Sequence, residues 1–181
     1  PKTGKTISIL KIPTTNRDWE DLCSDASGNL WIGDIGNNRN NRKNLRFYRY
    51  NVSNRQLDSV LFHFPDQTAF PPTTEAEMNF DVEAFVWQKD TLHFFTKSRF
   101  KGRHYTKHYT VPAIPGDYTA TLRDSLYIPN LVVTGAALSK DEKTLALIGY
   151  HIKKRKAFIP RSRASICLLS GFQGSNFLTG N

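Results

Sequence analysis

A strand, turn, strand pattern recurs three times along this chain of 181 residues and restricts it to an all-β fold. β-branched and aromatic residues dominate the paired segments, and helical periodicity is nearly absent. The first segments of the three copies are 18–22, 81–85 and 133–137, and the second segments are 30–34, 92–96 and 145–149. Self-similarity of this kind predicts a repeat architecture in which neighbouring units bury one another's apolar faces.

Each copy also predicts a third strand, and each copy is preceded by an outer strand that ends in a proline, which cannot donate to a sheet ladder. The third strands are expected at 45–50, 105–111 and 164–169, and the outer strands at 8–13, 60–65 and 125–129. Repeated four-stranded meanders are typical of β-propeller blades. The pattern therefore predicts about three propeller blades.

We divide the chain at the turns between these meanders. The expected units are the last strand of a preceding blade at 1–13, a first blade at 14–65, a second at 66–129 and a partial third at 130–181. Three blades do not normally close a ring, and an open stack leaves two sheet faces uncovered. We expect further blades beyond residue 181 to close the ring; pairing with a second copy of the chain is the alternative.

Several of these runs resemble a family of exported bacterial β-propeller proteins, which are distantly similar to the six-bladed phytase and esterase-like phytase propellers. The matching runs are Asp18–Leu22, Ile32–Asn38, Asn79–Phe85, Phe95–Lys97 and Val133–Ser139. The resemblance implies a ring of about six blades, of which this chain carries half. It also implies an extracytoplasmic setting, in the periplasm, at the cell surface or secreted, and the use of calcium, and it assigns no catalytic residue.

Basic residues concentrate in the connections between the second and third strands of each copy. The chain carries 25 Lys and Arg against 16 Asp and Glu, a net charge of +9, and twelve of the basic residues lie in 36–44, 98–104 and 151–163, which contain no acid. In an antiparallel meander these connections emerge on one face. Such a rim attracts anions, although solvated loops without a ligand have the same composition. The candidate ligand-binding residues are Arg39, Lys97, Arg99, Lys101, Arg103 and Lys153.

Two acidic pairs open the innermost strands at the same predicted face. Alternation along a strand puts Asp18 and Glu20 on one side of it, and Asp81 and Glu83 likewise. Four converging carboxylates repel one another unless a cation offsets their charge, and oxygen ligands of this kind suit calcium. We expect these four acids and Asp34 to be metal ligands. The alternative is that the acids bind backbone amides or pair with Lys97 and Arg99.

These features favour a propeller that binds an anionic ligand, either a small molecule or an acidic surface polymer, through calcium and basic loops. If the protein is an enzyme, metal-dependent phosphoester hydrolysis fits best. The alternative is a non-catalytic module of the cell envelope that docks a protein or a glycan. Nucleic acid is disfavoured, because the recognised binding motifs are missing. We expect His93 to satisfy a local hydrogen bond within a strand and His108 to lie at the surface.

Overall fold

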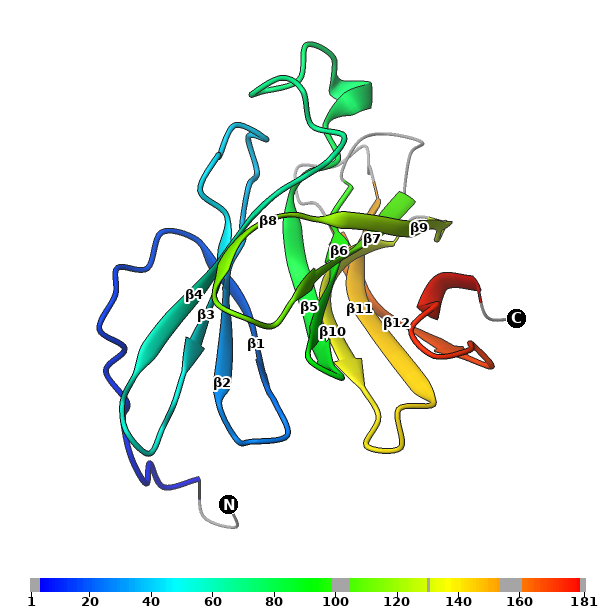
Figure 1. Ribbon diagram of the computed structural model, residues 1–181. Helices are drawn as coiled ribbons and strands as arrows, with labels where there is room; N and C mark the ends of the chain where they lie inside the picture. The colour runs from blue at the N-terminus through cyan, green and yellow to red at the C-terminus, as the bar shows by residue number, and fades with distance from the viewer. Residues whose placement is uncertain (1–3, 99–104, 130, 154–160, 180–181) are drawn as a thin grey trace.

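The computed structural model describes residues 4–98, 105–129, 131–153 and 161–179, and these form three β-sheets with two short 3₁₀ turns (Figure 1). The first sheet contains β1 (Trp19–Ser24), β2 (Leu30–Asp34), β3 (Arg46–Tyr50), β4 (Leu57–His63) and β8 (Gly116–Thr119). The second contains β5 (Val82–Gln88), β6 (Thr91–Thr96), β7 (Tyr105–Pro112) and β9 (Thr121–Tyr127). The third contains β10 (Val132–Leu138), β11 (Thr144–Lys153) and β12 (Arg161–Ser170). The prediction of an all-β fold is confirmed.

Apart from β8, each sheet is a meander in which neighbouring strands pair antiparallel. In each sheet a short turn joins the first two strands. The turn between β5 and β6 consists of Lys89 and Asp90, both at positive φ (46° and 57°). Two residues with positive φ are the hairpin geometry that matches strand twist. The longer connections, 35–45 between β2 and β3 and 64–81 between β4 and β5, lie at the opposite end of the sheets (Figure 1).

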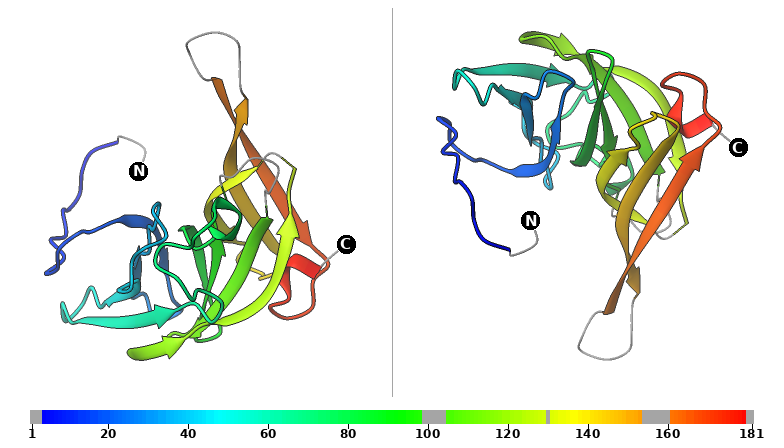
Figure 2. Two further views of the ribbon diagram at one scale, coloured as in Figure 1. Left: turned by 90° about the horizontal axis from the view of Figure 1, so that it is seen from above. Right: turned by 90° about the horizontal axis from the view of Figure 1, so that it is seen from below.

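The sheets stack in sequence order, with the second sheet between the other two (Figure 2). Alternation along β6 shows why the middle sheet is apolar on both faces. Phe94 packs into an aromatic core shared with Phe47 and Phe62 of the first sheet, at ring separations of 5.5 and 4.7 Å. Phe95 faces the other way, into a core shared with Leu147 of the third sheet. β6 therefore contributes side chains to both apolar cores, one on each face of the second sheet.

Two strand assignments differ from the sequence prediction. Residues 8–12 form no strand, and Ile7 and Ile9 are 92% and 82% exposed. A further difference is β8, which was not predicted and which pairs with β4, the outer strand of the first meander. β8 lies in the connection between β7 and β9 and pairs parallel with β4, from Val60 opposite Gly116 to His63 opposite Thr119. It covers an edge that would otherwise expose unpaired backbone groups.

The third hairpin is also longer than predicted. β11 continues to Lys153 and β12 begins at Arg161, so the ends of the predicted connection 151–163 are paired strand. His151 in β11 contacts the Ser165 hydroxyl across the hairpin at 2.6 Å. The basic residues at 154–156 lie outside the described residues.

The outward face of the third sheet is apolar. Ile148 stands opposite Ile166 across the β11–β12 pair, and Leu168 lies two residues further along β12. These side chains are 45%, 63% and 68% exposed. The equivalent face of the second sheet, carrying Phe95, is buried. Contiguous exposed apolar faces of this kind are typical of interaction surfaces.

Candidate functional site

The two acidic pairs come together where the first strands of adjacent sheets lie side by side. Glu20 is on β1 and Glu83 on β5, and these two strands are in direct contact. The Asp21 carboxylate helps to join them by accepting a hydrogen bond from the backbone N–H of Phe85 at 3.2 Å. Asp21 also accepts from the backbone of Ala136 on β10, so one carboxylate bridges the innermost strands of all three sheets.

Glu20 shows the electrostatic consequence of this arrangement. Burial raises its pKa from 4.5 to about 8, reinforced by the charges of Glu83, Asp18 and Asp81, while Lys97 acts weakly in the opposite direction. Like charges held together in a partly buried site disfavour ionisation. Glu20 therefore retains its proton at neutral pH unless a cation replaces it.

Lys97 provides the positive charge within this acidic cluster, which we define as Asp18, Glu20, Asp81 and Glu83. Its ammonium bonds the Glu83 carboxylate and lies 3.9 Å from Oδ2 of Asp81, and the residue is only 7% exposed. The sequence analysis listed Lys97 among the candidate ligand-binding residues, with pairing to the acids as the alternative. The ion pairs of Lys97 with Glu83 and Asp81 correspond to that alternative.

Gly36 closes one side of the cluster. Its backbone N–H donates to the carbonyl of Asp18 at 3.2 Å. A Cβ at this position would collide with the carboxylates of both Asp18 and Glu20. Glycine is therefore required by the close approach of the β2–β3 loop to the two acids, a role that the sequence analysis did not assign.

Asp34, the fifth expected metal ligand, is fully buried beside the cluster. Its Oδ1 accepts from the backbone N–H of Asp18 and from Nη2 of Arg42, both at 3.0 Å. Its Oδ2 has no hydrogen-bond partner among the described residues. One oxygen of Asp34 thus fixes the start of β1, and the other is a buried acceptor.

The loop after β2 is tied to the start of β5 by polar contacts. The backbone N–H of Asn37 donates to Oδ1 of Asp81 at 2.7 Å, and the Asn37 side chain donates to the carbonyl of Phe80 at 2.9 Å. The Asn40 side chain in turn accepts from the backbone N–H of Phe80 at 2.8 Å. These buried bonds fix the positions of the two acidic pairs relative to each other.

The expected basic rim is described only in part. Arg39 is exposed in the β2–β3 loop. Arg99, Lys101 and Arg103 lie outside the described residues, as does the side chain of Lys153, whose backbone is the last residue of β11. Within the described residues, no group of three or more His, Cys, Asp or Glu side chains is arranged around one point as a metal site.

Comparison with known proteins identifies no relative. No family model, curated protein or solved structure matches the chain. Among the described residues, no helix has the length and apolar character needed to span a membrane.

Proposed function

We propose that the three sheets are consecutive blades of a β-propeller and that the acidic cluster binds calcium, through which this end of the molecule holds an anionic ligand. The observation that carries the proposal is the coupling of Glu20 to Glu83, Asp18 and Asp81 from two adjacent strands. The cluster contains four carboxyl groups and one ammonium, so it has an excess of acid that a divalent cation would offset.

The donor chemistry of the cluster fits calcium. Carboxylates are the hard oxygen ligands that this ion prefers, and it tolerates irregular coordination. Glu20, Asp18 and Glu83 would hold the ion, and the buried Oδ2 of Asp34 is a further acceptor beside them. Because Lys97 bonds Glu83, calcium binding requires this ammonium to share or yield that carboxylate.

The anionic ligand follows from the charge distribution along the sequence. Arg39 and the basic residues of the other two connections, Arg99, Lys101, Arg103 and Lys153, provide positive charge in sequence segments that carry no acid. Calcium, when bound, would polarise a phosphoryl oxygen and lower the pKa of an attacking water. Phosphoester hydrolysis is therefore the reaction that we assign if the protein is catalytic. An extracytoplasmic location belongs to the same proposal.

A second candidate is a non-catalytic module in which the cluster only joins two sheets. The Lys97 ion pairs favour it, because they already neutralise part of the acid without any metal. In this case the partner would be a protein or an acidic glycan. Both candidates require the ring of blades to be closed. Further blades or a second copy of the chain would close it and cover the apolar face formed by Ile148, Ile166 and Leu168.

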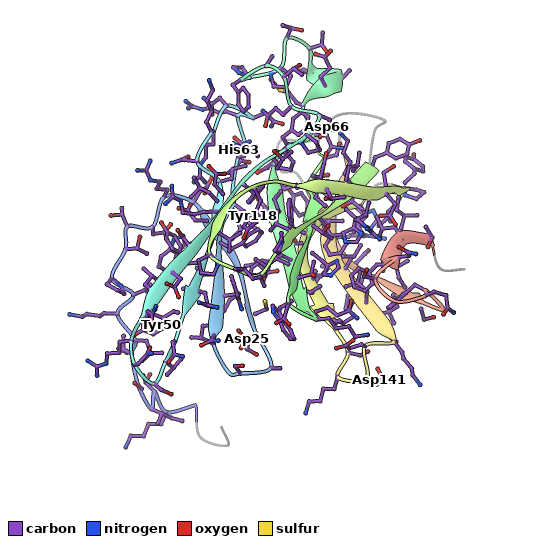
Figure 3. All side chains as sticks on the ribbon, in the orientation of Figure 1. Asp25, Tyr50, His63, Asp66, Tyr118 and Asp141 are labelled. Atoms are coloured by element: carbon purple, nitrogen blue, oxygen red, sulfur yellow. The ribbon has the colours of Figure 1, made fainter. Side chains whose placement is uncertain are left out.

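Isothermal titration calorimetry with calcium separates the two candidates. We expect one calcium ion to bind the wild type, and the Glu20→Gln and Glu83→Gln variants to lose at least about tenfold in affinity, because each removes a charged ligand. Asp141→Asn is the matched control, because Asp141 is an exposed acid in the turn between β10 and β11, at the lower end of the molecule in Figure 3, and is not part of the cluster. Absence of calcium binding would favour the second candidate, in which the cluster only joins two sheets.

A further inference from the structure

A buried chain of three polar side chains crosses the second sheet, away from the acidic cluster. The Asp124 carboxylate on β9 lies 3.2 Å from Nδ1 of His108 on β7, and Nε2 of His108 lies 3.0 Å from Nδ1 of His93 on β6. His108 is fully buried, contrary to the surface position expected from the sequence, and His93 is 2% exposed. Phe177 packs against both rings, with centroid distances of 5.0 Å to His93 and 5.4 Å to His108.

When both imidazole rings are neutral, each has a single N–H, and the order of these contacts determines which nitrogen of each ring carries it. A carboxylate only accepts hydrogen bonds, so Nδ1–H of His108 donates to Asp124. Nε2 of His108 must then accept, and Nδ1–H of His93 is its donor. The remaining nitrogen of His93, Nε2, keeps a lone pair and acts as an acceptor. Burial, together with the charges of His108 and Arg123, lowers the pKa of His93 to about 3, so this ring is neutral at pH 7.

His93 lines a cavity of about 300 Å³ together with Thr91, Thr110 and Arg123. The cavity lies near the β5–β6 turn, at the other end of β5 from Glu83. In the part of the chain that the structure describes, its lining contains cations and hydroxyls but no acid, and the polar side chains relevant to a ligand are Lys89, Thr91, His93, Thr110 and Arg123. Lys89 is 3.8 Å from Glu142, whereas Arg123 bonds the neutral Asn176 side chain at 3.2 Å. Among the described residues no carboxylate forms an ion pair with Arg123.

This lining combines a positive charge with one fixed acceptor. The guanidinium of Arg123 and the hydroxyls of Thr91 and Thr110 suit the negative oxygens of an anion. The Nε2 lone pair of His93 has the opposite requirement, because it needs a ligand O–H or N–H. A fully deprotonated anion would leave this acceptor facing an oxygen lone pair, which is unfavourable in a partly enclosed site.

We propose that this cavity is a second binding site, for a small oxyanion that carries an O–H group, with Arg123 contacting its negative oxygens and Nε2 of His93 accepting its hydrogen bond. Hydrogenphosphate is the simplest such ligand. The role of the Asp124–His108 pair is positional, since it fixes the tautomer of His93 and turns its lone pair toward the ligand. This site does not depend on the function proposed for the acidic cluster.

Phosphate and sulfate test the proposal, because at pH 6 inorganic phosphate carries an O–H and sulfate does not. In calorimetric titrations we expect the wild type to bind phosphate about tenfold or more tightly than sulfate. His93→Phe keeps an aromatic ring against Phe177 but has no acceptor, and should reduce phosphate affinity to that of sulfate. Arg123→Gln should weaken both anions. Arg55→Gln, at an exposed turn of the first sheet, should change neither.

A spectroscopic measurement covers the case in which His93→Phe does not fold. In the wild type, phosphate should shift the ¹⁵N resonance of Nε2 of His93 while Nδ1 remains protonated, and sulfate should not produce this shift. Equal affinity for the two anions, absence of phosphate binding, or discrimination that survives in His93→Phe would each overturn the proposal.

Discussion

Lys97 on the second sheet bonds the carboxylate of Glu83, two residues beyond the Asp81 whose Oδ1 accepts from the backbone N–H of Asn37 on the first sheet. The Asp81 and Glu83 pair thus contacts a buried cation through Glu83 and the loop after β2 of the neighbouring sheet through Asp81. Because Glu20 lies beside Asp81 and Glu83, the same residues both join the two sheets and form the proposed cation site. Mutations in it are expected to change both stability and calcium binding.

Glu20 should make the metal-free protein less stable as the pH rises. The pKa of Glu20 is about 8 in the folded protein and 4.5 in the unfolded chain, so the folded state binds the proton more tightly. The stabilisation that results is fully present below pH 4.5 and is lost as the pH rises to about 8. Glu20→Gln should remove the decline and be more stable than the wild type at pH 9, by on the order of 1 kcal/mol after screening by water. Urea unfolding with a chelator at pH 5 and pH 9 measures this.

Glu77→Gln is the control for the Glu20 variant, since Glu77 is exposed in the β4–β5 connection. Its stability should follow that of the wild type at both pH values. If Glu20→Gln also follows the wild type at pH 9, the carboxylates are not coupled in the way described here.

Removing the buried ammonium should be costly. Lys97→Met leaves Glu83 and Asp81 without their cation, and loss of one partner of a buried ion pair lowers the free energy of unfolding by about 3–5 kcal/mol. Lys107→Met is the comparison, because Lys107 pairs with Asp66 at 2.6 Å in a more exposed position and should cost about 0–1 kcal/mol. Equal losses in the two variants, measured by urea unfolding at pH 7, would contradict the assigned burial.

Gly36→Ala should disturb the cluster through shape alone. The added methyl collides with the carboxylates of Asp18 and Glu20, and overpacking of this kind costs about 1–3 kcal/mol. Calcium affinity should fall in the same variant, because the two acids must separate. Ser27→Ala, in the exposed β1–β2 turn, should leave both quantities unchanged. Unaltered thermal unfolding of Gly36→Ala would show that the loop moves aside freely.

The exposed face of the third sheet should promote association. Ile166 and Leu168 are more than half exposed on a sheet face whose counterpart in the second sheet is buried. Sedimentation velocity of residues 1–181 should reveal self-association that Ile166→Ser with Leu168→Ser reduces, while Val52→Ser, in a turn of the first sheet, has no effect. A monomer at every concentration would show that a second copy does not cover this face.

The sequence predicted the features that depend on local pattern. Alternation and turn residues located eleven of the twelve strands that the described residues form. Because the acidic pairs occupy equivalent positions in two repeats, their juxtaposition followed from the stacking of the sheets. Pairing of sheet edges depends on tertiary structure, so β8 was missed and residues 8–13 were wrongly assigned to a strand. The burial of His108 could not be seen either, since it requires Phe177 from the far end of the chain to pack on its ring.

The most direct test of the acidic cluster is thermal unfolding with calcium and with chelator. We predict that calcium raises the unfolding midpoint of the wild type, and that of Lys97→Met by more, because the competing ammonium is gone. The midpoint of the double variant Glu20→Gln, Glu83→Gln should not change with calcium. Midpoints that are the same with calcium and with chelator in both the wild type and Lys97→Met would contradict this prediction.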